Sequence, residues 1–190
     1  GKAGIQIDVA ADTYYNRETG YYDGILTPGK KDKDQMMDLY RKMVREYPVV
    51  VIEDPFYEED YDSHAELTRS VDIQIVGDDL YTTNPERVQT GAEKKSTNCV
   101  LLKVNQIGTI TETLEMVNLA YRNGMGVMPC ESRGEGAAIA DYSVGINAGS
   151  IRESGINETA NRLLEIEKEL GDKAVFLGKK GLKGKRFADG

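Results

Sequence analysis

The sequence predicts an α/β protein built from parallel strand–helix units, arranged as an incomplete TIM-like (β/α) barrel. Two observations predict this class: short apolar segments alternate with helical segments, and charged residues directly follow several of the apolar segments. Strands that alternate with helices form parallel sheets through right-handed crossovers. Charged residues gathered at the carboxyl ends of such strands are typical of a barrel whose active site lies on that face.

The segment that best shows this design is residues 49–55, VVVIEDP. Its four β-branched residues predict a strand buried on both faces, as in a parallel sheet. Glu53 and Asp54 stand where the strand ends, and Pro55 stops the backbone ladder. Buried carboxylates are costly unless a metal ion, a cation or hydrogen bonds compensate them, so this strand end is a candidate site.

The other expected strands also end close to charged residues. They are residues 5–8, ending on Asp8; 74–79, ending on Asp78 and Asp79; 99–103, ending on Lys103; 126–130, before Glu131, Ser132 and Arg133; and a weaker one over 149–152, ending on Arg152. A closed barrel of this type has eight strands, and these segments give only about six βα units. Because an open barrel leaves strand edges exposed, we expect upstream strands, in this polypeptide or in a second chain.

Helical segments are expected between the strands. They cover residues 34–47, 65–71, a segment capped by Thr83 or Asn84, 111–124, 137–147 and 157–171. Residues 10–24 are expected to form a small hairpin or excursion. We divide the chain into a partial barrel over residues 1–178 and a basic, glycine- and lysine-rich tail over 179–190. The tail is expected to be mobile, with anion or partner binding as the alternative.

Composition excludes several functions for this chain of 190 residues. The net charge of −8 argues against nucleic acid as a partner, because phosphates would be repelled. No apolar run approaches the roughly 20 residues of a membrane-spanning helix. Cys99 and Cys130 are expected as free buried thiols in a reducing compartment. His64, the one histidine, is expected to cap a helix or lie at the surface, since no second histidine or nearby cysteine could complete a zinc site.

Three carboxylates and one lysine are expected at the mouth of the sheet. Asp8, Glu53 and Asp78 offer the oxygen ligands that suit Mg²⁺. Lys103 stands on the next strand, and a lysine beside a metal cluster can act as a base near neutral pH. A metal ion with a lysine is suited to removing a proton next to a carboxylate. A single acid at a strand end would be expected only to accept hydrogen bonds from neighbouring backbone amides. Three acids and a lysine on successive strands favour an active site instead.

Longer motifs now suggest a family. They are YPVVVIEDPFYEEDYDSHAEL over residues 47–67, IQIVGDDLYTTNP over 73–85, LLKVNQIGTITETLE over 101–115 and LLEIEKELGDKAVFLG over 163–178. Together these segments closely resemble the carboxyl-terminal barrel of the enolase family, over nearly the whole chain. The resemblance implies a TIM-like barrel entered at its third strand.

The resemblance also implies a reaction and its residues. Asp8, Glu53 and Asp78 match the family's magnesium ligands. Lys103 matches the lysine that removes the proton from carbon 2 of 2-phosphoglycerate, in the reversible dehydration to phosphoenolpyruvate. The implied protein is a cytoplasmic glycolytic lyase that takes a phosphorylated carboxylate and binds neither nucleic acid nor membrane. It is expected to be an oligomer, with the amino-terminal domain and first strands in the same polypeptide or in a separate chain.

Two motifs depart from the family pattern. Family members carry Ser-His-Arg-Ser after the seventh strand, where this chain has Cys130-Glu131-Ser132-Arg133. The lysine that holds the substrate carboxylate in the family is Arg152 here. We therefore expect Arg133 and Arg152 to bind anionic groups, with Glu131, Ser132 and Asp79 completing the substrate-binding set.

These departures leave two alternatives open. One is an enzyme that keeps the metal ion and Lys103 but acts on a different carboxylic or 2-hydroxy acid, since Glu131 would repel a phosphate group. The other is a non-catalytic enolase-like subunit that retains only the fold. The family's general acid and mobile lid lie upstream of the third strand, outside this sequence.

Overall fold

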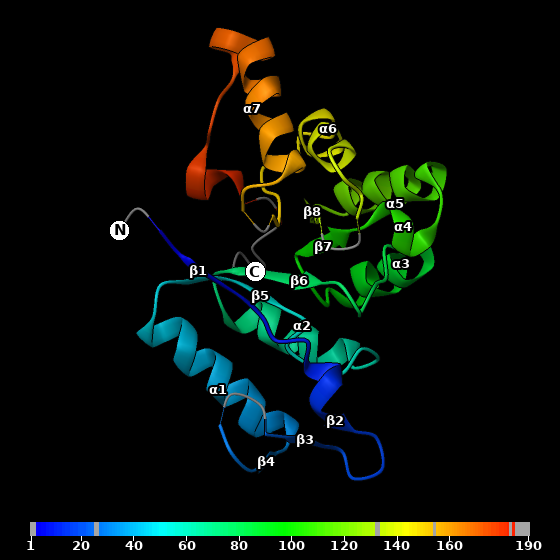
Figure 1. The fold of residues 1–190 in the computed structure, drawn as a ribbon. Coiled ribbons are helices and arrows are strands. Elements are labelled where there is room, and N and C mark those ends of the chain that lie inside the picture. Colours follow the sequence, from blue (N-terminus) through cyan, green and yellow to red (C-terminus); the bar gives the residue numbers. More distant parts are fainter. Residues whose placement is uncertain (1–2, 25–26, 132–133, 154, 183, 185–190) are drawn as a thin grey trace.

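The computed structural model describes residues 3–24, 27–131, 134–153, 155–182 and 184. Its centre is a five-stranded, all-parallel sheet in the order β1-β5-β6-β7-β8 (Figure 1). The strands are β1 (Ile5–Asp8), β5 (Val49–Glu53), β6 (Gln74–Gly77), β7 (Cys99–Leu102) and β8 (Gly126–Pro129). Sequential parallel strands joined by helices confirm the predicted partial barrel.

The weaker sixth strand is reduced to a single parallel bridge between Cys130 and Arg152. Two backbone hydrogen bonds flank it: the Arg152 N–H donates to Pro129 O at 2.8 Å, and the Glu131 N–H donates to Arg152 O at 3.1 Å. Gly149 prevents an earlier start, because its φ of +84° is not an extended conformation. Arg152 is nevertheless fixed beside the end of β8.

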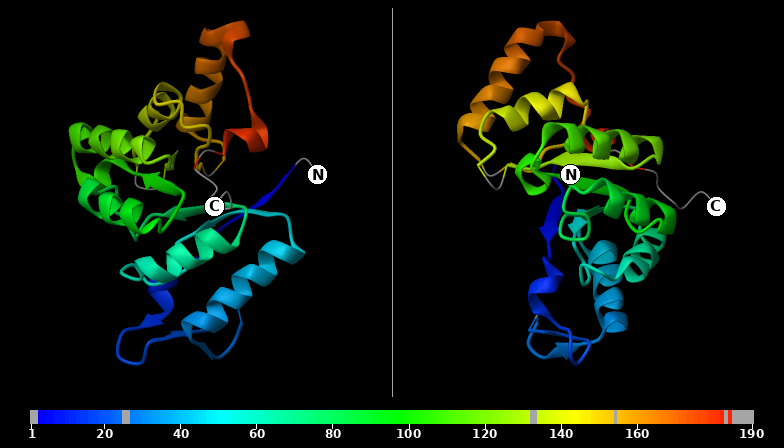
Figure 2. Two further views of the ribbon diagram at one scale, coloured as in Figure 1. Left: turned by 180° about the vertical axis from the view of Figure 1, so that it is seen from behind. Right: turned by 90° about the vertical axis from the view of Figure 1, so that its right-hand side faces the viewer.

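Helices surround the sheet in chain order. They are α1 (Lys33–Glu46), α2 (Tyr61–Ser70), α3 (Pro85–Lys94), the short α4 (Val104–Ile107), α5 (Ile110–Arg122), α6 (Ala138–Gly145) and α7 (Glu158–Leu170), with 3₁₀ turns η1 (Ala11–Tyr14), η2 (Gly171–Lys173) and η3 (Gly178–Gly181). Neighbouring helices pack in pairs, α1 on α2, α2 on α3, α3 on α5 and α6 on α7. Figure 2 shows this succession from two further sides. None of the described helices is long and apolar enough to cross a membrane.

Polar caps explain where the predicted helices begin. Asp32 caps α1 and forms a capping box with Gln35, which satisfies two backbone amides at once. Asn84 caps α3, and Pro85 fills the first helical position, where no N–H is needed. Asn157 caps α7 by accepting from the Ala160 N–H at 3.0 Å. The expected starts of these helices are confirmed to within one residue.

Helix α2 begins earlier than predicted, and this changes the position of His64. Asp60 caps the helix at Ser63 N, so the first turn starts at Tyr61 rather than near residue 65. The His64 side chain is then fully buried and lies edge-on against Phe56. The prediction of a capping or surface histidine is therefore wrong. Burial lowers the pKa of His64 to about 4, so it packs as a neutral ring.

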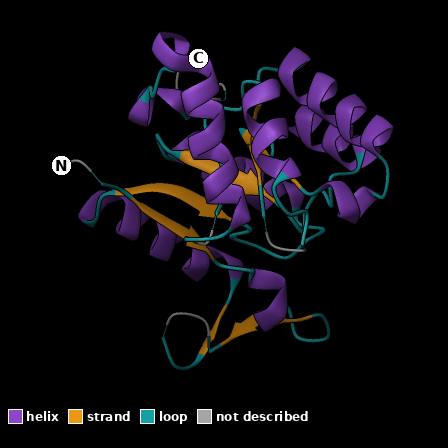
Figure 3. Cartoon of the chain, turned by 45° about the horizontal axis from the view of Figure 1, so that its top comes forward, coloured by secondary structure: helices purple, strands orange, loops and turns teal. Residues whose placement is uncertain are grey.

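The expected hairpin after β1 is a small antiparallel sheet of three strands, drawn below the main sheet in Figure 3. The strands are β2 (Tyr15–Asn16), β3 (Tyr21–Asp23) and β4 (Lys30–Lys31). The buried Tyr22 ties it to the segment after β5, since its hydroxyl accepts the Tyr57 N–H at 3.0 Å. This small sheet therefore braces the first two strands of the main sheet.

The main sheet is apolar on both faces, as the strand sequences predicted. One face packs beneath the helices. The opposite face forms a separate cluster, called here the inner cluster, made of Val51, Val76, Cys99, Leu101, Met128 and Cys130. Both cysteines are buried as thiols outside any disulfide, as the sequence predicted, and the reducing compartment stays a prediction. Since side chains alternate along a strand, residues two positions beyond inner-cluster members project on the same face.

The tail begins inside the packed structure. Leu182 packs against the inner cluster, and Gly184 forms an antiparallel bridge with Met125, at the start of β8. A Cβ at Gly184 would lie 2.1 Å from the carbonyl oxygen of Asn98, so only glycine permits this approach. The described part of the tail thus covers the amino-terminal end of the sheet. The domain boundary at residue 179 stays a prediction.

We expect Gly91→Ala to lower the free energy of unfolding by about 1–3 kcal/mol, the usual cost of overpacking. A Cβ at Gly91 in α3 would lie 2.2 Å from the hydroxyl of the buried Tyr81, which is held by Thr97 at 3.0 Å. Urea denaturation measures the effect. The matched control is Gly145→Ala in α6, where a Cβ meets nothing within 4 Å. Equal effects of the two substitutions would contradict the packing argument.

Candidate active site at the carboxyl ends of the strands

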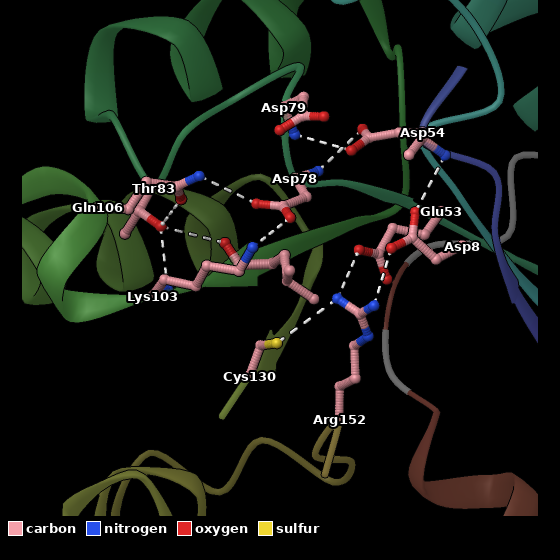
Figure 4. A network of polar contacts seen from close by, with 12 residues as sticks. Asp8, Glu53, Asp54, Asp78, Asp79, Thr83, Lys103, Gln106, Cys130 and Arg152 are labelled. Carbon is pink, nitrogen blue, oxygen red and sulfur yellow. Dashed lines mark hydrogen bonds and ion pairs between the residues drawn. The ribbon is translucent and has the colours of Figure 1, made fainter. Parts of the chain in front are cut away.

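Four of the predicted site residues project from neighbouring strand ends. Asp8 and Glu53 are the last residues of β1 and β5, and they face each other in the strand register. Asp78 directly follows β6, and Lys103 directly follows β7. Glu53, Asp78 and Lys103 each stand two positions beyond a residue of the inner cluster, so they share its face. Figure 4 shows them converging on one region.

Lys103 and Asp78 form a buried ion pair. The Nζ of Lys103 donates to Oδ2 of Asp78, and both side chains are less than 10% exposed. Gln106 donates from Nε2 to the other oxygen, Oδ1, at 3.1 Å. Thr83 connects the ends of this network: its Oγ1 accepts the Lys103 N–H at 3.0 Å and donates to Gln106 Oε1 at 2.9 Å. Lysine and acid are therefore held in place from two sides.

Arg152 bonds the other two acids. Its Nη2 donates to Oδ2 of Asp8 at 2.8 Å, and its Nη1 donates to Oε1 of Glu53 at 3.2 Å (Figure 4). Nη1 also lies 3.7 Å from the sulfur of Cys130. The sequence predicted Arg152 at this site, but it did not predict pairing with these carboxylates.

Glu53 is fully buried, and its ionisation is correspondingly disfavoured. Burial is the largest cause, followed by the nearby charge of Asp8, and together they raise the pKa of Glu53 to about 7. Arg152 and Lys103 act in the opposite direction, while Asp78 adds to the rise. Burial, followed by the charge of Asp78, also raises the pKa of Asp79.

Asp54 fastens the end of β5 to the loop after β6. Its Oδ1 accepts the Asp78 N–H at 3.0 Å, and its Oδ2 accepts the Asp79 N–H at 2.8 Å. Its backbone has φ of +42°, an unusual conformation for a residue other than glycine. Burial raises the pKa of Asp54, although the two amide donors favour the ionised form. We interpret Asp54 as the residue that positions Asp78.

The acids present suit a hard metal ion. Within the described ranges, Glu53, Asp54 and Asp78 each offer a carboxylate oxygen, and these three atoms lie within 4.8 Å of one another. Such a buried group of carboxylates could hold a metal ion through oxygen ligands alone. The sequence predicted Asp8 as the third ligand. Asp8 is not one of these three acids, and its two oxygens accept the Ala10 N–H and the Arg152 guanidinium, just as both Asp54 oxygens accept backbone amides. Asp8 as a metal ligand therefore stays a prediction.

The remaining predicted residues lie around this centre or outside the described part. Glu131 stands beside Arg152 through the backbone hydrogen bond next to the bridge. Asp79 contributes its backbone amide to Asp54, and its side chain is half-buried. Ser132 and Arg133 fall outside the described residues, so their predicted roles stay predictions.

The sequence did not predict the supporting roles of Asp54, Thr83 and Gln106. The sequence indicates Thr83 only as a candidate helix cap. It indicates no role for Gln106, which follows Lys103 in the motif LLKVNQIG. The one sequence signal for Asp54 was its place in the strand-end acidic pair. The roles of all three depend on contacts across strands, which no local pattern reveals.

Comparison with known proteins identifies the family. A family model described as the enolase carboxyl-terminal TIM barrel domain matches residues 1–185. The enolase of Methanocaldococcus jannaschii is 46% identical over 173 residues, which cover 87% of this chain. This chain belongs to the enolase family. It spans 40% of the length of that curated relative.

Membership of the enolase family confirms the resemblance drawn from the four sequence motifs. It gives the described sheet a natural interpretation as part of the enolase barrel, with the acids and Lys103 at the carboxyl ends of its strands.

We expect Asp54→Asn to lower the free energy of unfolding by about 1–3 kcal/mol, because an amide side chain leaves one backbone N–H without its acceptor. Urea denaturation of the purified protein measures this loss. Asp38→Asn is the control, since that aspartate is 82% exposed on α1. A loss no larger than that of the control would show that the two amide bonds do not fasten the strand ends.

The free energy of unfolding of the metal-free protein should fall as pH rises from 4.5 to about 7. Glu53 has a raised pKa in the folded protein, so within this window the folded state binds a proton that the unfolded state has lost. The shift corresponds to a loss of about 3 kcal/mol across the window. Urea denaturation in the presence of a chelator, at several pH values, measures it.

Glu53→Gln serves as the comparison, because the amide cannot titrate. The variant should lack this component of the pH dependence and should be more stable than the unaltered protein at pH 8. Parallel pH profiles for the two proteins would contradict the assignment.

Proposed function

We propose that the protein is a magnesium-dependent enolase, a lyase that interconverts 2-phosphoglycerate and phosphoenolpyruvate. The observation that carries the proposal is the buried contact of Lys103 with Asp78 at adjacent strand ends, within a chain of the enolase family. We propose further that it acts in the cytoplasm as an oligomer. The amino-terminal part of its barrel would come from the same polypeptide or from a second chain.

Lys103 would act as the base in this reaction. As a neutral amine, its Nζ would take the proton from the carbon next to the substrate carboxylate and become an ammonium group. The ion pair with Asp78 in the structure corresponds to the lysine after this proton transfer. Asp78, already its hydrogen-bond partner, would stabilise that positive charge. Thr83 and Gln106 would keep both groups oriented, so that little rearrangement is needed as the proton moves. The hydroxyl group would leave with a proton as water, assisted by a general acid outside these residues.

The acids would hold the metal ion. Asp8, Glu53 and Asp78 would bind Mg²⁺, which when bound supplies positive charge against the negative charge that develops on the substrate carboxylate. Arg152 and Arg133 would bind anionic groups of the substrate. A guanidinium group suits this role, because it can donate two parallel hydrogen bonds to a carboxylate or phosphate.

A second candidate is an enzyme of the same chemistry that acts on an unphosphorylated acid. The observation that favours it is the position of Glu131, whose backbone is bonded to that of Arg152 at the rim of the site. A carboxylate there disfavours a nearby phosphate. Kinetics with a panel of 2-hydroxy acids distinguish the two candidates by the preferred substrate.

Lys103→Ala should lower kcat/KM for 2-phosphoglycerate by at least about a hundredfold, the lower range for loss of a positioned general base. The ultraviolet absorbance of the enol product follows the reaction. Lys42→Ala on the exposed side of α1 is the matched control and should retain full activity. Activity of Lys103→Ala within a few-fold of the unaltered protein would refute the assignment of Lys103 as the base.

A further inference from the structure

The guanidinium group of Arg152 lies between two of the acids that are proposed to bind metal. Its two terminal nitrogens are divided between Asp8 and Glu53, at 2.8 and 3.2 Å. A single guanidinium group thus bridges Asp8 and Glu53, which are paired with each other in the register of β1 and β5. Figure 4 shows the side chain reaching these acids from the opposite edge of the sheet.

The bridged acids need a cation at this position. Glu53 is completely buried, and a buried carboxylate left without a partner is strongly destabilising. Arg152 supplies the positive charge permanently, because a guanidinium group does not lose its proton in proteins. In the metal-free protein, Arg152 therefore compensates the negative charge of Asp8 and Glu53, as a bound metal cation would.

Arg152 and a metal ion cannot use these oxygens together. Oε1 of Glu53 and Oδ2 of Asp8 are both occupied by guanidinium N–H groups. A divalent ion bound at the same oxygens would also repel the guanidinium charge at close range. The other oxygens have partners as well, since Oδ1 of Asp8 accepts the Ala10 N–H at 3.1 Å and Oε2 of Glu53 accepts from Gln6 Nε2 at 3.5 Å. Binding of one cation to this pair therefore disfavours binding of the other.

The backbone of Arg152 is fixed, whereas its side chain is partly exposed. The backbone is fixed on both sides, by Arg152 N–H to Pro129 O at 2.8 Å and by Glu131 N–H to Arg152 O at 3.1 Å. The side chain itself is 32% exposed, and so is open to water on one side. A rotation of the side chain alone can thus uncover the acids.

We propose that Arg152 is an internal cation that competes with the divalent metal ion for Asp8 and Glu53. The inference rests on the proposed function for the identity of the metal site. It makes Arg152 a residue that sets metal affinity, in addition to binding an anionic group of the substrate. A lysine at this position would compete less, because a single ammonium group does not present the planar, two-pronged donor set that spans both acids.

Isothermal titration of Mg²⁺ into the complete protein, in the form in which it is isolated, tests the proposal. Arg152→Met removes the charge but keeps the aliphatic stem, and it should bind Mg²⁺ about tenfold more tightly, within the usual range for coupled sites. Arg152→Lys should fall between the two. Arg162→Met is the matched control, because Arg162 also pairs with several carboxylates but lies on α7, away from the site. Its Mg²⁺ affinity should equal that of the unaltered protein.

Equal or weaker Mg²⁺ binding by Arg152→Met, or no binding by either protein, would overturn the proposal. If Arg152→Met does not fold, Arg152→Lys decides it, and an affinity no higher than that of the unaltered protein overturns it. Turnover of 2-phosphoglycerate is scored separately. If the enzyme is active but its Mg²⁺ affinity is the same with and without Arg152, the proposed competition alone is refuted. If the Mg²⁺ affinity changes as expected but 2-phosphoglycerate is not turned over, only the proposed function is contradicted.

Discussion

The compensation of negative charge at the strand ends is the constraint on which the site depends. Parallel strands deliver Asp8, Glu53 and Asp78 to one edge of the sheet, where solvent is largely excluded from the last two. Carboxylates placed so close together repel one another and lose hydration. Lys103 compensates Asp78, and Arg152 compensates the other two. Without both cations this edge of the sheet would carry unpaired buried charge or would take up protons, as the raised pKa of Glu53 indicates.

The two cations also determine how the sheet is held. Lys103 ties neighbouring strand ends, β7 to β6, whereas Arg152 joins β1 and β5 to a segment 144 and 99 residues further along the chain. The Arg152 contacts therefore connect opposite edges of the five-stranded sheet and favour its curvature. Asp54 adds a third tie between β5 and the loop after β6 that uses only backbone amides. The polar groups that form the site thus also fix the geometry of the strands around it.

Much of this arrangement could be predicted from the sequence, because the repeating unit is local. An apolar run that ends on a charged residue specifies a buried strand and the direction of its last side chain, so the acids and Lys103 were found. The position of His64 was missed, since the start of α2 depended on which acid caps it, and Asp60 was one of several within a charged run. The partners of Arg152 were missed for another reason. Contacts between residues so far apart depend on the curvature of the sheet, which local periodicity does not encode.

The position of Arg152 links the stability of the protein to its proposed activity. In the metal-free protein the guanidinium stabilises the fold by neutralising Asp8 and Glu53. In the proposed metal-dependent reaction the same group would give up these acids and would then bind an anionic group of the substrate. Residues at functional sites commonly hold such conflicts, in which the arrangement that best stabilises the resting protein is not the one that acts. An arginine at this position strengthens the resting state more than a lysine would, because it holds both acids at once. The proposed competition thus follows from the same two ion pairs that stabilise the resting site, and its expected consequence is weaker binding of the metal ion.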